Sequence, residues 1–238
     1  MASEKIQGSL KTGSAISAVC EGAVNGCGNI NTWPLKQLRL LKAAERCFAE
    51  KGYYHTTIRE VAAIAGTNSC MINYYFGSKQ NLLLGIIGLR AKTFEELIAK
   101  SKARTRSPLE TLLVLSELMI KKVFNEPAFH KLLIQLYTIG EHGEGLAYLY
   151  RIKHKNQLYI ADILRLGIES GTFSEHADPE SVAGVITSVA NHYLLNMRYF
   201  KWSAGKRCSE RTFTAEMLPK AVAEAHLLIR ALTYIKGK

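Results

Sequence analysis

The amino-acid sequence predicts an all-α protein. Apolar residues recur at intervals of three and four along most of the chain, and no convincing run of alternating apolar and polar residues marks a strand. Proline, which interrupts helices, occurs five times in 238 residues, and 47% of the residues are hydrophobic. The chain is therefore long and apolar enough for two packed helical regions.

Residues 1–33 precede the first helical pattern and are rich in Gly, Ser, Ala and Asn. They lack the compact apolar segment of a signal peptide, so we expect a flexible tail. No apolar stretch anywhere in the chain approaches the ~20 residues that cross a membrane. We therefore expect no membrane association.

A first domain is predicted over residues 34–84, and it begins with a helix that ends at Lys51, where Gly52 stops it. The apolar residues of this helix fall at helical spacing: Leu40, Ala43, Ala44, Cys47 and Phe48. Thr57 is the expected N-cap of a second, shorter helix. The apolar stripe of that second helix consists of Ile58, Val61, Ala62 and Ala65.

Gly66 then provides a turn, since glycine adopts left-handed backbone conformations at little cost. Asn68 is expected to cap a third helix. One face of that helix carries Ile72, Tyr75 and Phe76, which we interpret as core residues. Helix, glycine turn and helix is the arrangement that places a second helix in the major groove of DNA. An ordinary helical hairpin inside an all-α core has the same spacing, so spacing alone leaves both interpretations open.

Residues 38–84 resemble the N-terminal DNA-binding domain of the tetracycline-repressor (TetR) family. The shared elements, in the same order, are F-x-x-K-G-Y at 48–53, T-T-I-R-E-V-A at 56–62, Ala65-Gly66 and Y-Y-F-G-S-K at 74–79. The resemblance covers about a fifth of the chain. It implies a three-helix DNA-binding domain, followed over residues 85–238 by a helical domain for effector binding and dimerisation.

The resemblance also assigns contacts to a double-stranded DNA operator, position by position. The residues expected at base edges are Arg59, Ser69, Cys70 and Met71. The residues expected at phosphates are Thr57, Asn73, Tyr74 and Lys79. Arg59 has a fork suited to guanine, with a salt bridge to a nearby acid as the alternative. Family members often have Tyr in place of Asn73, and small or hydroxylic residues at 70 and 71, so the operator sequence does not transfer from a relative.

The charge distribution is consistent with DNA as the partner. The chain has 31 Lys and Arg against 20 Asp and Glu, a net charge of +11, of which residues 34–106 carry +8. Phosphate neutralisation requires such a concentration of positive charge. An acidic membrane surface is the alternative partner, but no strongly basic amphipathic helix with a large apolar face supports it.

The second domain is expected to contain longer helices. In chain order we expect a helix over 79–103 capped by Ser78, a helix from Pro108 to Asn125, a helix opened by Pro127, a loop at Gly140, Gly143 and Gly145, and a helix to Ser170 closed by Gly171. The last two helices carry the clearest apolar stripes. One consists of Val182, Val185, Ile186, Val189, Ala190, Tyr193, Leu194 and Met197. The other consists of Leu218, Ala221, Val222, Ala225, Leu228, Ile229 and Leu232.

Both stripes have two interpretations: they face the core of the chain itself, or they face a second copy. The resemblance implies the second, because these helices match the pair through which TetR-like proteins form a four-helix dimer interface. A twofold dimer would present two recognition helices to half-sites about 34–36 Å apart, or a multiple, on a pseudo-palindrome. We therefore expect a homodimer.

Helix bundles hold small molecules between their helices, so an unknown small-molecule effector is expected in the second domain. The candidate polar residues of its pocket are His130, Tyr137, His154, Asn191, His192 and Tyr193. A single His or Tyr on a helix is more often an ordinary core or surface group. No subset has the spacing of metal ligands or of a catalytic triad, so we expect no metal, no other cofactor and no catalytic residue.

The five cysteines are Cys20, Cys27, Cys47, Cys70 and Cys208, with no C-x-x-C pair and no histidine spacing suited to zinc. Their odd number and scatter suit unpaired thiols in a reducing cytoplasm. Cys70, near the start of the expected recognition helix, is the one whose oxidation would disturb DNA contact. An unreactive small residue is the simpler interpretation.

The sequence thus favours a DNA-binding transcriptional regulator, a repressor released from its operator by a small-molecule effector. One alternative is a TetR-like DNA-binding protein without such an effector, controlled by a protein partner or organising the chromosome. The other is an all-α enzyme, which a buried cluster of carboxylates and histidines around one cavity would support.

Overall fold

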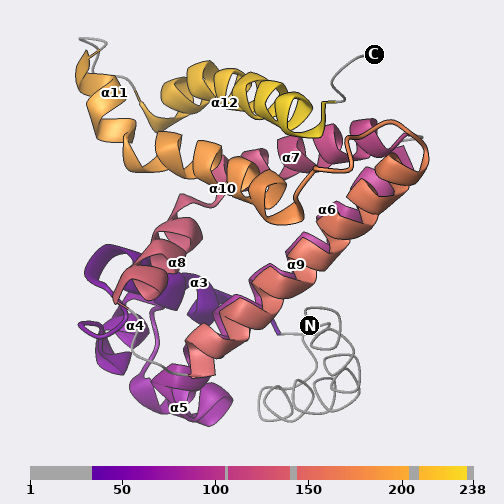
Figure 1. The fold of residues 1–238 in the computed structure, drawn as a ribbon. Helices are drawn as coiled ribbons and strands as arrows, with labels where there is room; N and C mark the ends of the chain where they lie inside the picture. Colours follow the sequence, from indigo (N-terminus) through magenta and orange to yellow (C-terminus); the bar gives the residue numbers. More distant parts are fainter. Residues whose placement is uncertain (1–33, 105–106, 140–143, 204–208, 235–238) are drawn as a thin grey trace, which may run out of the picture. The chain divides into compact units, whose positions relative to one another are not determined.

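The computed structural model describes residues 34–104, 107–139, 144–203 and 209–234, and within these ranges every regular element is a helix (Figure 1). The prediction of an all-α fold is confirmed. The predicted tail, the glycines 140 and 143 and the cysteines 20, 27 and 208 lie outside the described residues. In the part that is described, no helix combines the length and the apolar character needed to span a bilayer.

The chain divides into two compact units, the first ending at Leu89 and the second beginning at Arg90. The first unit contains α3 (Leu35–Lys51), α4 (Ile58–Ile64), α5 (Ser69–Phe76) and the beginning of α6 (Lys79–Arg104). Helix α3 packs on α4, and α4 packs on α5. Phe48 of α3 and Ile72 of α5 have no exposed surface, and they form this small core together with other buried residues such as Leu41 and Val61.

Glycines shape the connections of the first unit as predicted. Gly52 follows α3 with φ 90°, and its N–H donates to the carbonyl of Phe48 over 2.9 Å. Gly66 lies between α4 and α5 with φ 66°, a conformation that any other residue adopts at a cost. The helix-turn-helix geometry therefore depends on two positions at which a side chain would strain the backbone.

The second unit continues α6 and adds α7 (Pro108–Asn125), α8 (Pro127–Ile139), α9 (Glu144–Glu169), α10 (Pro179–Leu195), α11 (Met197–Ser203) and α12 (Glu210–Thr233). The predicted limits of α7 and the predicted start of α8 are confirmed. Ser107 caps α7, since its Oγ accepts the N–H of Glu110 over 3.2 Å, and proline occupies the first helical position.

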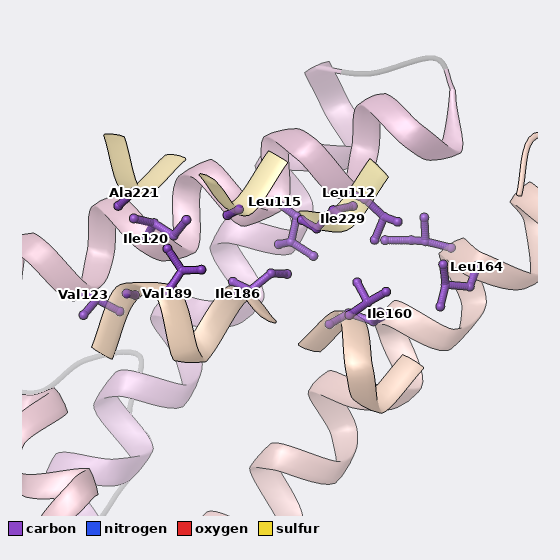
Figure 2. Packing of buried hydrophobic residues seen from close by; sticks show 14 of the residues in the cluster. Leu112, Leu115, Ile120, Val123, Ile160, Leu164, Ile186, Val189, Ala221 and Ile229 are labelled. Carbon is purple, nitrogen blue, oxygen red and sulfur yellow. The ribbon is translucent and has the colours of Figure 1, made fainter. Parts of the chain in front are cut away.

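Helices α7, α10 and α12 pack on one another, and α9 covers α7 and α10. Figure 2 shows Ile120 of α7, Val189 of α10 and Ala221 of α12 gathered between the three helices. Ile160 and Leu164 extend the same cluster onto α9. This apolar cluster is the main core of the second unit.

The stripes assigned to a dimer interface belong mostly to that core. The residues of the two stripes that are buried within the chain itself are Val182, Ile186, Val189, Ala190, Tyr193, Leu194, Ala221, Ala225 and Ile229. Four further residues, Val185, Met197, Leu218 and Val222, are partly buried against the same cluster. This corrects the assignment of the buried residues, because a side chain covered by its own chain is not available to a second copy. Only Leu228 and Leu232 of the two stripes are exposed.

The structure differs from the predicted helix limits at two places. The helix expected to continue through Met197 ends at Leu195, where Asn196 is the C-cap. The backbone N–H and the side-chain Nδ2 of Asn196 both donate to the carbonyl of His192, over 3.1 and 2.9 Å. Gly145, expected in a loop, lies buried in the first turn of α9.

Candidate nucleic-acid interface

The start of α4 is fixed by a reciprocal pair of hydrogen bonds. Thr57 Oγ1 accepts the backbone N–H of Glu60 over 3.2 Å, and the Glu60 carboxylate accepts the backbone N–H of Thr57 over 2.8 Å. Thr57 is the N-cap that the sequence predicts. The role of Glu60 was missed, although the spacing T-x-x-E is the signature of this capping box.

Glu60 also binds the cation at the end of α3. Its Oε1 lies 2.5 Å from Nζ of Lys51. The hydrogen bond from Lys51, followed by the bonds from Thr57, lowers the pKa of Glu60 to about 2. Glu60 is thus charged at neutral pH, and it holds α3 and α4 together through one side chain.

The start of α5 is fixed by Asn68, whose Oδ1 accepts the N–H of Met71 over 3.0 Å, as the cap prediction requires. The helix then separates its side chains into two faces. Ile72 and Phe76 are buried in the first unit, and Tyr75 is partly buried. The opposite face exposes Cys70, Asn73 and Tyr74, with Ser69 and Met71 partly exposed.

Tyr74 is 81% exposed, which is more than any other tyrosine in the described ranges. Its ring contacts only the neighbouring ring of Tyr75, at 5.2 Å between centroids in an edge arrangement. An aromatic side chain of this size gains little from folding when it remains in water. The exposed ring of Tyr74 is therefore available for contact with a partner.

Arg59 projects from the first turn of α4 and is exposed. Among the described residues, no acid lies within ion-pair distance of its guanidinium. The alternative of a salt bridge to a nearby acid is therefore not realised there. Its five donors remain oriented to solvent, as a base-reading arginine requires.

Lys79, expected at a phosphate, has partners within the first unit. Its Nζ donates to the carbonyl of Thr56 over 2.9 Å and to that of Tyr54 over 3.4 Å. The same ammonium lies 4.5 Å from the ring centroid of Tyr53, and burial lowers its pKa. Lys79 therefore holds the segment before α4, a role that the sequence did not suggest.

The candidate effector residues of the second unit have different surroundings. His130 and Asn191 are partly buried, with the Nε2 atom of His130 shielded from solvent, whereas His154 and His192 are exposed. Tyr137 stacks on Tyr150 at 6.0 Å between ring centroids, and burial raises the pKa of Tyr137.

Tyr193 is a structural group as well as a candidate. Its hydroxyl donates to Glu224 over 2.8 Å, and burial together with this bond raises the pKa of Tyr193 to about 12. Its ring stacks on that of Phe200 at 5.4 Å. The six candidates are thus not brought together by the contacts of the second unit, apart from the neighbours His192 and Tyr193, whose rings are 5.5 Å apart.

Two other kinds of site, a reactive thiol and a bound metal ion, would require cysteines or clustered metal ligands. Cys47 and Cys70 are free thiols, one buried and one exposed. Over the described ranges, no three His, Cys, Asp or Glu side chains are placed to hold a metal ion together. The arrangement that carries chemistry is therefore the capped pair α4–α5 with its exposed polar face.

Comparison with known proteins agrees with this geometry. Residues 40–86 match the sequence profile of the family described as bacterial regulatory proteins, tetR family. The transcriptional repressor NicS of Pseudomonas putida is 32% identical over 73 residues, which are 31% of this chain and 34% of NicS. The chain thus spans about a third of the length of the curated relatives it matches first.

Solved structures extend the likeness to both units. The fatty acid degradation regulator FadR from Bacillus halodurans has a TM-score of 0.66 at 17% identity, covering 83% of this chain and 96% of FadR. AibR, solved in complex with isovaleryl coenzyme A and operator DNA, has a TM-score of 0.57 at 20% identity, covering 78% of this chain and 97% of AibR. At these identities the likeness shows the fold.

A capped helix-turn-helix unit followed by a larger all-helical unit defines the class of helix-turn-helix regulators. The matched profile and relatives are specific to one family within that class. Residues 40–86 match the profile of the TetR family of bacterial regulatory proteins, so the N-terminal part of the chain is similar to the DNA-binding domain of that family.

Proposed function

We propose that the chain is a homodimeric transcriptional repressor rather than an enzyme, and that it acts on a pseudo-palindromic operator in the cytoplasm. A small-molecule effector bound in the second unit releases it from the operator. Residues 34–84 bind DNA, and residues 85–238 bind the effector and form the dimer. The division of the chain after Leu89 supports this assignment of domains.

The observation that carries the proposal is the exposed face of α4 and α5. We call it the reading surface, and it consists of Arg59, Ser69, Cys70, Met71, Asn73 and Tyr74. Both helices are capped, α4 packs on α3 and α5 packs on α4, so the surface is held rigidly. Arginine, amide and phenol groups suit base edges and phosphates, and Met71 and Cys70 suit the methyl group of thymine.

Release by an effector follows from linkage. The effector must bind more tightly to the form that does not bind DNA, and DNA then weakens effector binding by the same factor. The likeness to AibR, which was solved with both isovaleryl coenzyme A and operator DNA, supports a ligand-bearing second unit in this fold. Thr57, Asn73, Tyr74 and Lys79 remain proposed phosphate contacts, with Lys79 acting also through the segment that it holds.

A dimer surface is supported by leucines that the second unit leaves exposed. They are Leu195 at the end of α10, and Leu227, Leu228 and Leu232 on α12, between 37% and 69% exposed. These leucines are exposed positions on α10 and α12, the helices whose buried faces fill the core. A second copy covering them would remove apolar surface from water, and an isologous interface would use the same residues twice.

DNA binding is tested by selecting genomic fragments with the full chain and measuring their affinity. Arg59→Ala should lower affinity and relax base preference, at a cost of about 1–3 kcal/mol in binding free energy. Tyr74→Ala should lower affinity for all fragments alike. Arg165→Ala, which removes an exposed ion-paired arginine of the second unit, is the matched control. Unchanged affinity in both test variants would show that the reading surface lies elsewhere.

Dimerisation is tested by sedimentation of Leu228→Glu, with Leu158→Glu on α9 as a control of comparable exposure. The α12 variant should sediment as a monomer with its helix content retained, whereas the control should remain a dimer. If both remain dimers, the interface is not on the outer face of α12.

A further inference from the structure

A cluster of charged side chains lies at the corner between α7 and α8 of the second unit. Nη1 of Arg90, on α6, lies 2.5 Å from Oε1 of Glu126, the residue between α7 and α8. The two side chains are 16% and 23% exposed, so the pair is shielded from water, unlike the other ion pairs of the described residues. Shielding strengthens the attraction between the charges.

Two further groups hold Arg90 in place. Nζ of Lys122, on α7, donates to the backbone carbonyl of Arg90 over 3.0 Å. The guanidinium carbon lies 5.5 Å from the ring centroid of Phe129, a buried residue of α8. One turn of α6 is therefore attached to α7 and α8 by an ion pair, a hydrogen bond and a cation–π contact.

The corner also contains two buried polar atoms without a hydrogen-bond partner. They are Oε2 of Glu126 and Nε2 of His130. Burial, followed by the charges of Lys122 and Arg90, lowers the pKa of His130 to about 4, so its ring is neutral at neutral pH. A buried polar atom without a partner destabilises the fold, so this corner has hydrogen-bonding capacity that a bound molecule would use.

The chemistry of the corner selects one class of ligand. Arg90 already binds a carboxylate in a partly dry environment, and arginine holds carboxylates with a planar fork. The N-terminus of α8, which carries no acidic residue in its first turn, also favours negative charge. The neighbouring ring of Phe129 is buried, so the body of the ligand is apolar.

We propose that this corner binds the carboxylate of an apolar carboxylic acid, which takes the place of Glu126 on Arg90 and contacts His130. Glu126 then turns to solvent, so that one carboxylate at a time neutralises the arginine. The exchange removes the ion pair between α6 and the α7–α8 corner. That it also releases DNA rests on the proposed function, because α6 begins in the first unit.

The exchange is tested by calorimetric titration of the full chain with hexanoate and decanoate, using hexanamide as the neutral analogue. Glu126→Gln keeps the shape of the corner and removes the competing charge, so it should raise affinity for the carboxylates at least tenfold. Arg90→Met should lower it at least tenfold. Glu95→Gln, which removes a carboxylate of an exposed ion pair on the same helix, should bind like the unaltered chain.

Three results would overturn the proposal: no carboxylate binding by Glu126→Gln, equal binding by Arg90→Met and the unaltered chain, or equal binding of hexanamide. If Arg90→Met does not fold, Arg90→Lys serves instead, because it keeps the charge but lacks the fork; its affinity should also fall. DNA retention is measured separately. A chain that retains genomic fragments but binds no carboxylate refutes this inference alone, whereas a chain that retains no fragment refutes the proposed function.

Discussion

The two units of this chain use their side chains differently. In the first unit the pair α4 and α5 is made of short helices, in which α4 buries only Val61 and Ala62 and α5 only Ile72 and Phe76. This pair depends on caps, a turn glycine and an ion pair at its helix ends, and α3 supplies most of the buried residues beneath it. The second unit is built mainly of long helices such as α10, which buries six residues, although its short helix α11 buries none. Polar groups define the α4–α5 pair, and apolar packing defines the main helices of the second unit.

This difference decides how well the structure of each unit can be predicted from the sequence. A short helix is marginal alone, so its caps and turns must be of particular residue types at particular positions. A long amphipathic helix needs only a stripe, and many sequences supply one. A stripe also does not say whether it faces its own core or another molecule, which is why α10 and α12 were assigned to a partner.

The largest expected effect is a pH dependence of stability that differs between the two units. Because the pKa of His130 in the folded chain, about 4, lies below its ordinary 6.5, the unfolded chain binds more protons between these values. Stability of the second unit should therefore fall as pH drops from about 6.5 to 4, by up to about 3 kcal/mol. Urea denaturation followed at several pH values measures this loss.

His130→Phe should remove that dependence. In the first unit the corresponding group is Glu60, whose pKa of about 2 lies below its ordinary 4.5, so its contribution is complete above pH 4.5 and is lost only as pH falls toward 2. A second unit as insensitive as the first between pH 6.5 and 4.5 would contradict the buried, neutral state of His130.

The next effect tests packing in the second unit. A Cβ added at Gly167, on α9, would lie 1.9 Å from a ring carbon of Phe173, which is itself part of the core. Gly167→Ala should therefore cost about 1–3 kcal/mol of unfolding free energy, since the ring must move within a close-packed core. The measurement is urea denaturation monitored by circular dichroism.

Gly184, on α10, is the matched control, because no heavy atom lies within 4 Å of a Cβ added there. Gly184→Ala should raise stability by about 0.5–1 kcal/mol, as alanine is the better helix former. Equal effects of the two substitutions would mean that the ring of Phe173 does not occupy the position described.

The smallest effect concerns the first unit. Thr57→Ala removes the hydroxyl that caps α4 and should cost about 1 kcal/mol, whereas Thr57→Ser should retain the cap. Denaturation of both variants gives the difference. A loss as large for serine as for alanine would place the stabilisation in the threonine methyl group and not in the cap.

Much of the fold followed from local signals. Ser107 with Pro108, Pro127 and the glycines 52 and 66 marked helix limits, because each acts through its own backbone geometry. The break at Asn196 was not predicted, because the apolar stripe continues past it to Met197. The exposed face of α5 was predicted from its spacing, and its role in binding DNA stays a prediction.

The groups that were missed act over long distances in sequence. Lys79 reaches the carbonyls of Thr56 and Tyr54, and Arg90 reaches Glu126 more than thirty residues away. Such pairs leave no periodic pattern in the sequence, because each charged residue could pair with any of several residues of opposite charge. Glu60 is the exception, since its capping role was present in the local sequence.

The hydrogen bonds and ion pairs within the first unit also limit its response to salt. Of the seven basic residues on α3–α5 and at the start of α6, Arg46, Lys51 and Lys79 already have partners within the unit. The four that have none among the described residues are Lys36, Arg39, Lys42 and Arg59. Only cations that neutralise phosphates release counterions, so these four, together with the proposed phosphate contact Lys79, correspond to a logarithmic salt slope of about −4.5 per chain at most. Net charge alone would overstate how steeply salt weakens the complex.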